Sequence, residues 1–228
     1  MKTIELMKKL RDYPLFTTND VAKIVMKKSD YVKTLLYRLE RQKLIYKIER
    51  GKYTIYDDAF VFASYISIPS YISLWSAVRY YNLTEQMPKT IFIMVTKQRK
   101  NLKFQNVSIE FVKTKHFFGF KRENYNGFDI FIANPEKAII DSLLLKRVPL
   151  DEVTKAIQTN TLNISLLINY AIKTKNKCLT KRLGFILEDN GFKCSKLIRF
   201  IDLNYALLDL TRRREGKINK RWMVIDNR

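Results

Sequence analysis

The sequence is poor in the residues that make flexible segments. Its 228 residues include six glycines and five prolines, which leaves little room for long flexible linkers. No apolar run approaches the roughly 20 residues that a membrane-spanning helix needs. The charged N-terminal stretch also lacks the uninterrupted apolar core of a signal peptide. We therefore expect a cytoplasmic protein that makes no membrane contact.

Metal-ligating and nucleophilic residues are equally scarce. The two cysteines, Cys178 and Cys194, lie in stretches that read as helical, and without a secretion signal we expect both to be reduced. The one histidine, His116, has no Cys, Asp or His neighbour at ligand spacing, so we expect it on the surface or at a strand end. No glycine-rich phosphate loop, serine nucleophile elbow or Cys-x-x-Cys pair occurs. These absences predict no cofactor, no metal and no catalytic residues.

A nuclease is the enzyme class against which a basic protein must be tested. Restriction-type nucleases place an Asp on one strand and a Glu-x-Lys on the next, so that Glu and Lys face the same side. Asp129 lies on a candidate strand, but the lysine that follows Glu110 is Lys113, which faces the other way. A second Glu-Lys pair, at Glu136, has alanine at the lysine position and reads as helix. We predict that the chain is not an enzyme, with a nuclease kept as an alternative.

Acidic residues are the remaining shortage. The chain has 22 Asp and Glu residues against 43 Lys and Arg, a formal net charge of +21. The excess is spread along the chain and is densest in residues 211–228, which hold seven basic and two acidic residues. Such a charge attracts polyanions, nucleic acid among them, whatever their sequence. Composition alone also allows a lysine-rich surface of the kind common in thermophiles.

Two short helices are predicted before residue 26. The first ends near Tyr13-Pro14, because a proline disfavours the helical conformation of the residue before it. The second begins at a cap on Thr18 or Asn19. The side chains expected together on the apolar side of the first helix are Ile4, Leu6, Met7 and Leu10.

A longer amphipathic helix and a basic hairpin follow. The helix is expected to run from an N-cap at Ser29 to about Lys43. Residues 44–56 alternate as two short strands joined at Gly51, where glycine permits a positive φ. The side chains expected to face inward are Val32, Leu35, Leu36 and Leu39 of the helix and Ile45 and Ile48 of the hairpin. Three helices followed by a hairpin is the order of a winged helix-turn-helix domain.

The outward faces of this helix and hairpin suit duplex DNA. The N-terminal half of the helix would enter the major groove, where Thr34 and Arg38 reach base edges while lysines at its start meet phosphates. The expected DNA-binding residues are Lys28, Ser29, Tyr31, Lys33, Thr34, Tyr37, Arg38, Arg41, Lys47, Arg50 and Lys52. Two alternatives stay open: these charges form an ordinary solvated face, or the winged helix is a protein-protein module.

The remainder, residues 59–228, is expected to form a larger mixed α+β domain. Residues 59–83 read as two helices broken by Pro69, and "TIFIMVTK", "VSIEFVKT" and "FDIFIA" read as strands. "PEKAIIDSLLLK" reads as a helix, and residues 150–197 look helical throughout. The predicted fold class is therefore α+β: a winged helix-turn-helix domain on residues 1–58, then an α+β domain with a small sheet and several C-terminal helices, which ends in the basic segment 211–228.

Four stretches together resemble the AbiEi family of antitoxins from type IV toxin-antitoxin systems. They are "LERQKLIYKIERGKYTIY", "PSYISLWSAVRYYNLTEQMPKTIFIMVT", "NPEKAIIDSLL" and "LLDLTRRREGKINKRWMVIDN", which occur in the family's order and cover nearly the whole chain. The resemblance implies an N-terminal winged helix that binds double-stranded DNA at inverted repeats in its own promoter. It also implies a second domain that counteracts a nucleotidyltransferase toxin, and no catalysis. The alternative is a stand-alone winged-helix transcription regulator, or an RNA- or protein-binding regulator without a toxin partner.

The C-terminal segment departs from that family's pattern. Family members often have a proline where this chain has Leu210-Thr211, and "TRRRE" is unusually basic. Trp222 and the three residues after it form an apolar block that a disordered arm would not need, so we expect "RWMVID" to dock as a strand or extended segment on the second domain. The basic cluster that this docking would fix, facing the toxin or RNA, comprises Arg212, Arg213, Arg214, Lys217, Lys220 and Arg221.

Overall fold

The computed structural model describes residues 2–145, 147–159 and 161–228. Two compact units are present. Unit 1 comprises the chain up to Ile72 with Lys89–Lys115 and Arg122–Ile132, and unit 2 comprises Ser73–Pro88, His116–Lys121 and Ala133–Arg228. The division between the units does not fall at the predicted boundary after residue 58, because strands from later in the chain belong to the same unit as the winged helix.

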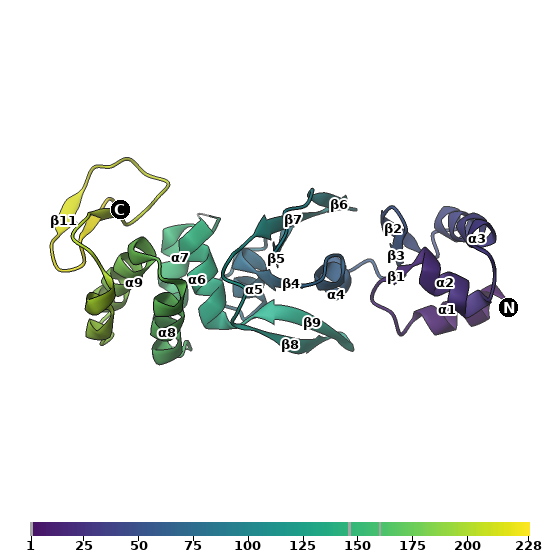
Figure 1. The fold of residues 1–228 in the computed structure, drawn as a ribbon, viewed down its shortest axis with the longest axis horizontal. Helices are drawn as coiled ribbons and strands as arrows, with labels where there is room; N and C mark the ends of the chain where they lie inside the picture. The colour runs from purple at the N-terminus through teal and green to yellow at the C-terminus, as the bar shows by residue number, and fades with distance from the viewer. Residues whose placement is uncertain (1, 146, 160) are drawn as a thin grey trace. The chain divides into compact units, whose positions relative to one another are not determined.

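The predicted order of three helices and a hairpin is confirmed in unit 1 (Figure 1). The helices are α1 (Thr3–Leu10), α2 (Thr18–Val25) and α3 (Ser29–Arg41). Strands β1 (Phe16–Thr17), β2 (Tyr46–Glu49) and β3 (Lys52–Thr54) form a small sheet in the order β1-β3-β2. The core between them is made of Leu6, Leu10, Phe16, Val21, Val32, Leu36, Leu39 and Ile45.

Three details of the winged helix differ from the prediction. Ile4 is 72% exposed, because at 100° per residue it lies about 200° around α1 from the buried Leu6. The cap of α2 is Thr17, which forms a capping box with Asp20: the Thr17 side chain accepts from the Asp20 backbone and the Asp20 side chain from the Thr17 backbone. Ser29 is the first residue of α3, which has no side-chain cap.

Most residues of a six-stranded sheet also belong to unit 1. Its strand order is β6-β7-β5-β4-β9-β8, with β5 and β7 parallel and β6 antiparallel to β7. The strands are β4 (Ser70–Ser73), β5 (Thr90–Val95), β6 (Leu102–Phe104), β7 (Val107–Lys113), β8 (Phe120–Tyr125) and β9 (Phe128–Ala133). The three predicted strands are confirmed as β5, β7 and β9, and the sheet is larger than predicted.

The segment predicted as two helices broken by Pro69 is partly different. Before the proline it is helical, as α4 (Ala59–Phe62) and η1 (Ala63–Tyr65). After the proline it first forms β4, whose residues are all buried, and only then α5 (Leu74–Tyr80). The prediction of helix at residues 70–73 is wrong because β4 lies between β5 and β9, so sheet pairing decides the conformation there.

Unit 2 contains the predicted helices of the second half. They are α6 (Pro135–Leu145), α7 (Leu150–Gln158), α8 (Ile164–Thr174), α9 (Lys177–Asp189) and the 3-10 helix η2 (Ser195–Phe200). Helices α6 to α9 pack as neighbours (Figure 1). The observed architecture is thus mixed α+β, as predicted. No helix in the described residues has the length and apolarity that crossing a bilayer requires.

A buried ion pair lies inside unit 2. Lys137 and Asp141, one turn apart on α6, are both fully buried and their side chains bond each other. The Ser73 hydroxyl also donates to Asp141, over 2.8 Å. Burial lowers the pKa of Lys137, an effect that Asp141 opposes. The "NPEKAIIDSLL" stretch therefore places a paired charge in the core.

The C-terminal segment is ordered by a second three-stranded sheet, as predicted. Strands β10 (Ala206–Leu207), β11 (Lys217–Asn219) and β12 (Val224–Asp226) take the order β10-β12-β11. Trp222 is fully buried, and its Nε1–H donates to the Glu188 carboxylate over 2.6 Å. "RWMVID" therefore docks on α9 through its indole and joins the sheet through β12.

Candidate nucleic-acid interface

One side of α3 is exposed to solvent. Its inward side buries Val32, Leu36 and Leu39, with Leu35 partly buried. On the other side two tyrosines are largely exposed, Tyr31 at 52% and Tyr37 at 59%. The predicted DNA-binding residues of this region are all exposed: Lys28, Ser29, Tyr31, Lys33, Thr34, Tyr37, Arg38 and Arg41. The structure thus gathers them on one surface, which we call the α3 face.

Local interactions hold some of these side chains in place. The Thr34 hydroxyl donates to the Asp30 carbonyl oxygen over 3.1 Å, and Lys33 forms an ion pair with the Asp30 carboxylate at 3.0 Å. The Arg41 guanidinium carbon lies 5.9 Å from the Tyr37 ring centroid. Both side chains of the Lys33–Asp30 pair are exposed, so the pair contributes little stability. Lys33 can therefore exchange the Asp30 carboxylate for a phosphate at low energetic cost.

The hairpin is the wing of the domain. Ile45 and Ile48 are buried, as predicted, and Gly51 has a φ of +77° at the turn. Lys47 and Arg50 are exposed, so both can reach a phosphate backbone. The turn also pairs with the start of α2, because the Thr18 backbone N–H donates to the Gly51 carbonyl oxygen over 3.2 Å.

Lys52 does not extend outward as expected. Its Nζ donates to the Ile66 carbonyl oxygen over 2.6 Å and forms an ion pair with Glu49 at 2.9 Å. Arg99, from the loop after β5, bonds the same Glu49 carboxylate and the same Ile66 carbonyl oxygen. We call Glu49, Lys52, Ile66 and Arg99 the wing latch, since it fastens the wing to the rest of unit 1.

Sequence reasoning missed Arg99. It occurs in the polar stretch "KQRKN", whose pattern resembles any solvated basic loop, and its partner Glu49 is 50 residues away. The structure places the Arg99 guanidinium 4.2 Å from the Phe111 ring centroid and leaves its side chain 23% exposed. A cation held over an aromatic ring and paired with a carboxylate is positioned more firmly than a surface arginine.

The second predicted cluster lies at the C-terminus. Its six side chains are exposed, and Arg212 and Arg221 form ion pairs with Asp209 at 3.4 Å and Glu188 at 2.9 Å. We call the cluster the basic loop; its residues are Arg212, Arg213, Arg214, Lys217, Lys220 and Arg221. The structure therefore brings these residues onto the part of unit 2 that carries the C-terminal sheet.

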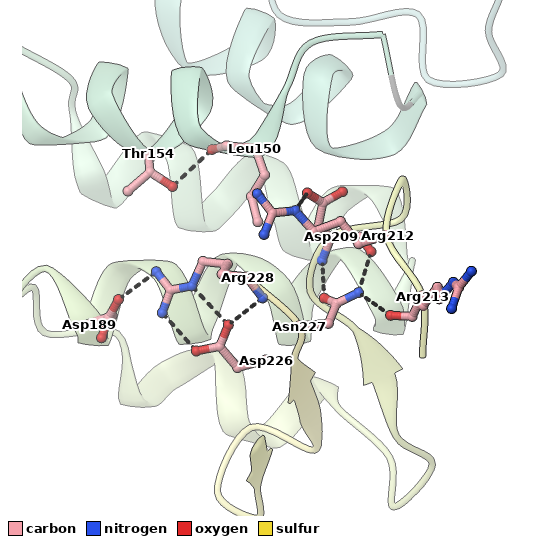
Figure 2. Close-up of polar contacts among 9 residues, drawn as sticks. All are labelled: Leu150, Thr154, Asp189, Asp209, Arg212, Arg213, Asp226, Asn227 and Arg228. Carbon is pink, nitrogen blue, oxygen red and sulfur yellow. Dashed lines mark hydrogen bonds and ion pairs between the residues drawn. The ribbon is translucent and has the colours of Figure 1, made fainter. Parts of the chain in front are cut away.

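Asn227 holds the backbone of the basic loop (Figure 2). Its amide nitrogen donates to the carbonyl oxygens of Asp209 and Arg213, each over 2.9 Å, and its amide oxygen accepts from the Asp209 backbone over 2.9 Å. Next to it, the Arg228 guanidinium bonds the carboxylates of Asp226 and Asp189. The buried side-chain amide of Asn227 thus anchors the loop backbone, while the cationic side chains of the loop remain in solvent.

Comparison with known proteins gives a likeness of fold. The sequence matches no protein-family model and no curated protein. A crystal structure of the RV2827C protein from Mycobacterium tuberculosis is similar over 97% of this chain and 89% of that chain, with a TM-score of 0.69 and 10% sequence identity. The two chains share a fold. At this identity the likeness concerns the arrangement of helices and strands alone.

Proposed function

We propose that this protein is a sequence-specific binder of duplex DNA that reads its operator with the α3 face. The observation that carries the proposal is the division of α3 into a buried apolar side and an exposed side of cations and hydroxyls. A helix of this kind, followed by a two-stranded wing, presents base-reading side chains to the major groove. The net charge of +21 supplies the sequence-independent attraction that such a binder needs.

We further propose that the DNA-binding protein is an antitoxin that represses its own operon and counteracts a nucleotidyltransferase toxin. The support is the resemblance of four stretches to AbiEi antitoxins, among them "NPEKAIIDSLL", whose lysine and aspartate form the buried pair of α6. Within this proposal the protein carries out no catalytic step. Its operator would be a pair of inverted repeats in its promoter.

The DNA-binding proposal is tested by substitutions on the α3 face. Arg38→Ala and Thr34→Ala should each weaken operator binding by about 1–3 kcal/mol if their side chains contact bases, with little change on random duplex. Lys100→Ala is the control, since Lys100 is an exposed cation that does not belong to α3. Gel-shift titrations on operator and random duplex measure both. Equal behaviour of Arg38→Ala and Lys100→Ala on both duplexes would remove α3 as the reading helix.

The antitoxin proposal is tested separately by growth. The neighbouring gene is expressed with and without this protein, and growth is scored. An inhibition that this protein relieves supports the proposal. A harmless neighbour, or an inhibition that it does not relieve, leaves a stand-alone transcription regulator.

The exposed tyrosines favour one alternative. Tyr31 and Tyr37 offer two aromatic rings on the α3 face, and unpaired RNA bases stack on exposed aromatic side chains. A regulator that binds single-stranded RNA would therefore lose affinity in Tyr31→Ala and Tyr37→Ala. Competition of operator duplex against a single-stranded RNA of equal length decides between the two ligands.

A further inference from the structure

Arg182 is a buried cation that pairs with no acidic side chain among the described residues of unit 2. It lies on α9 and is 8% exposed. Within the described residues its side chain makes one hydrogen bond, from Nε to the Leu207 carbonyl oxygen over 2.7 Å, and it forms no ion pair. Burial lowers the pKa of Arg182. Buried guanidinium groups usually bond a carboxylate with two parallel N–H donors, so this one lacks its ordinary partner.

A small cavity has Arg182 among its lining residues. Its volume is about 30 Å³ and its walls are mostly apolar, with Leu143, Val153 and Leu208 among the lining residues next to Arg182. One water molecule needs roughly 10–15 Å³ measured in this way. The cavity therefore has room for a small polar group such as a carboxylate. A doubly charged phosphate would lose more hydration free energy than a carboxylate on entering these mostly apolar walls.

The carboxylate that lines the cavity is already used. Asp209 belongs to the lining, but its Oδ1 accepts from the backbone and hydroxyl of Thr211 over 2.8 and 2.6 Å, and its Oδ2 faces Arg212 at 3.4 Å. Figure 2 shows Asp209 and Arg212 together beside Leu150, another lining residue. Asp209 thus orders the rim of the cavity and leaves Arg182 for an external group.

The rim itself is cationic. The basic loop starts beside Asp209, and Asn227 fixes its backbone there. Residues 211–221 contain no aromatic side chain, although single-stranded nucleic acid is usually bound by aromatic stacking together with positive charge. A carboxylate-sized cavity within a cationic rim matches an acidic protein surface better than RNA.

We infer that this cavity receives an aspartate or glutamate side chain from an acidic protein partner, whose carboxylate pairs with Arg182 while the basic loop meets surrounding acidic residues. A carboxylate on a flexible side chain can enter the small apolar opening, and its burial there gives Arg182 a counter-charge. Naming that partner as the toxin rests on the proposed function. The carboxylate site itself does not depend on it.

The site is tested on the whole protein with acetate, a mimic of the aspartate side chain. Nitrogen-15 NMR of arginine side chains follows the Nε–H signal of Arg182, identified by its loss in Arg182→Gln, during titration with sodium acetate and, at matched ionic strength, with sodium chloride or phosphate. We expect a saturable shift with acetate alone. A shift that grows linearly and equally with all three salts would overturn the site, and this outcome is independent of any toxin.

The partner is tested with the purified product of the neighbouring gene, provided that the wild-type protein relieves its toxicity. Arg182→Gln should weaken the complex about tenfold or more, whereas Arg199→Gln, an exposed arginine on η2, should stay within about twofold. Circular dichroism checks that both variants are folded. Equal affinities of the two folded variants would exclude Arg182 from the interface. If RNA binds the basic loop and abolishes the acetate-induced shift of the Arg182 signal, the protein-partner proposal is likewise wrong.

Discussion

The indole of Trp222 lies so close to Gly184 of α9 that a Cβ there would come within 2.1 Å of the ring carbon Cζ3. Glycine at this helix position thus makes room for the largest buried side chain of the C-terminal segment. Trp222→Ala should lower the free energy of unfolding by about 3–5 kcal/mol, and Gly184→Ala by about 1–3 kcal/mol through overpacking. Urea unfolding followed by circular dichroism measures both.

A double variant separates the close contact from other effects of these substitutions. In the Trp222→Ala background the added methyl of Gly184→Ala meets no ring, and alanine is the better helix former by about 1 kcal/mol. The second substitution should therefore become neutral or stabilising. Lys220→Ala, exposed in the same segment, should change stability by less than about 0.5 kcal/mol. Simple additivity of the two substitutions would contradict the contact.

The buried pair of α6 gives a second prediction. Asp141→Asn removes the negative charge of the buried pair while the positive charge of Lys137 stays buried, and we expect a loss of about 3–5 kcal/mol. Adding Lys137→Met removes that ammonium and should restore part of the stability. Thermal or urea unfolding of the three proteins provides the comparison. A double variant less stable than Asp141→Asn would show that Lys137 stabilises unit 2 by contacts other than its charge.

The two cysteines should differ in reactivity. Both are free thiols; Cys178 is exposed, and Cys194 is buried with its thiol donating to the Gly184 carbonyl oxygen over 3.4 Å. Burial, with a smaller contribution from Glu188, raises the pKa of Cys194 to about 11. Alkylation at pH 8 should therefore modify Cys178 alone, as read by mass spectrometry.

The same pKa sets a dependence of stability on pH. The folded state holds the Cys194 proton more tightly than the unfolded state, whose thiol has the ordinary pKa of 9.0. The stabilisation is fully present below pH 9 and is lost as the pH rises toward about 11. Cys194→Ala should flatten this part of the stability profile, and an unchanged profile would count against the buried thiol as its source.

Local pattern was enough to predict some parts of this structure. The apolar spacing of residues 32–39 and the alternation around Gly51 gave α3 and the wing, because both depend on contacts between residues close in sequence. The exposure of the α3 face follows from the same periodicity. The apolar block at Trp222 likewise indicated that the C-terminal segment is ordered.

Long-range pairing decided the parts that pattern missed. Strand β8, "FKRENY", contains exposed and half-buried residues alone, and its sequence shows no apolar run that would predict a strand. Lys52 and Arg182 are basic residues whose surroundings come from distant segments, through Ile66 for the first and Leu207 for the second. The residues next to a lysine or arginine in the sequence do not show whether its side chain is buried, held by distant groups or exposed to solvent.

The wing latch changes what the two wing lysines should contribute to DNA binding. Lys47 is exposed, so Lys47→Ala should weaken binding to all duplexes alike and reduce the salt slope by about one. Lys52 is held by Glu49 and Ile66, so Lys52→Ala should leave the slope nearly unchanged in the whole protein. Titrations at several salt concentrations measure the slopes. A loss of about one unit for Lys52→Ala would mean that the latch opens on DNA.

The fragment of residues 1–58 tests how far the winged helix is independent. Its buried core is drawn entirely from residues 6 to 45, with Tyr53 and Ile55 packed against it, so we expect the fragment to fold and to bind operator DNA. It lacks the aromatic partners of Tyr46 and Tyr56, which are Phe104 and Phe128 at centroid distances of 5.9 and 4.9 Å, and should therefore be less stable than the winged helix of the whole protein.

The fragment also lacks Ile66 and Arg99, so that of the latch contacts Lys52 keeps its ion pair with Glu49 alone. In the fragment, unlike the whole protein, Lys52→Ala should reduce the salt slope by about one, because an ammonium held by Glu49 alone can exchange that carboxylate for a phosphate. Under the antitoxin proposal, neutralisation of the toxin should require residues from Ala59 onward, which include Arg182 and the basic loop. Growth rescue by the fragment alone would contradict that division, and an equal slope for Lys52→Ala in both proteins would show that the latch does not control the lysine.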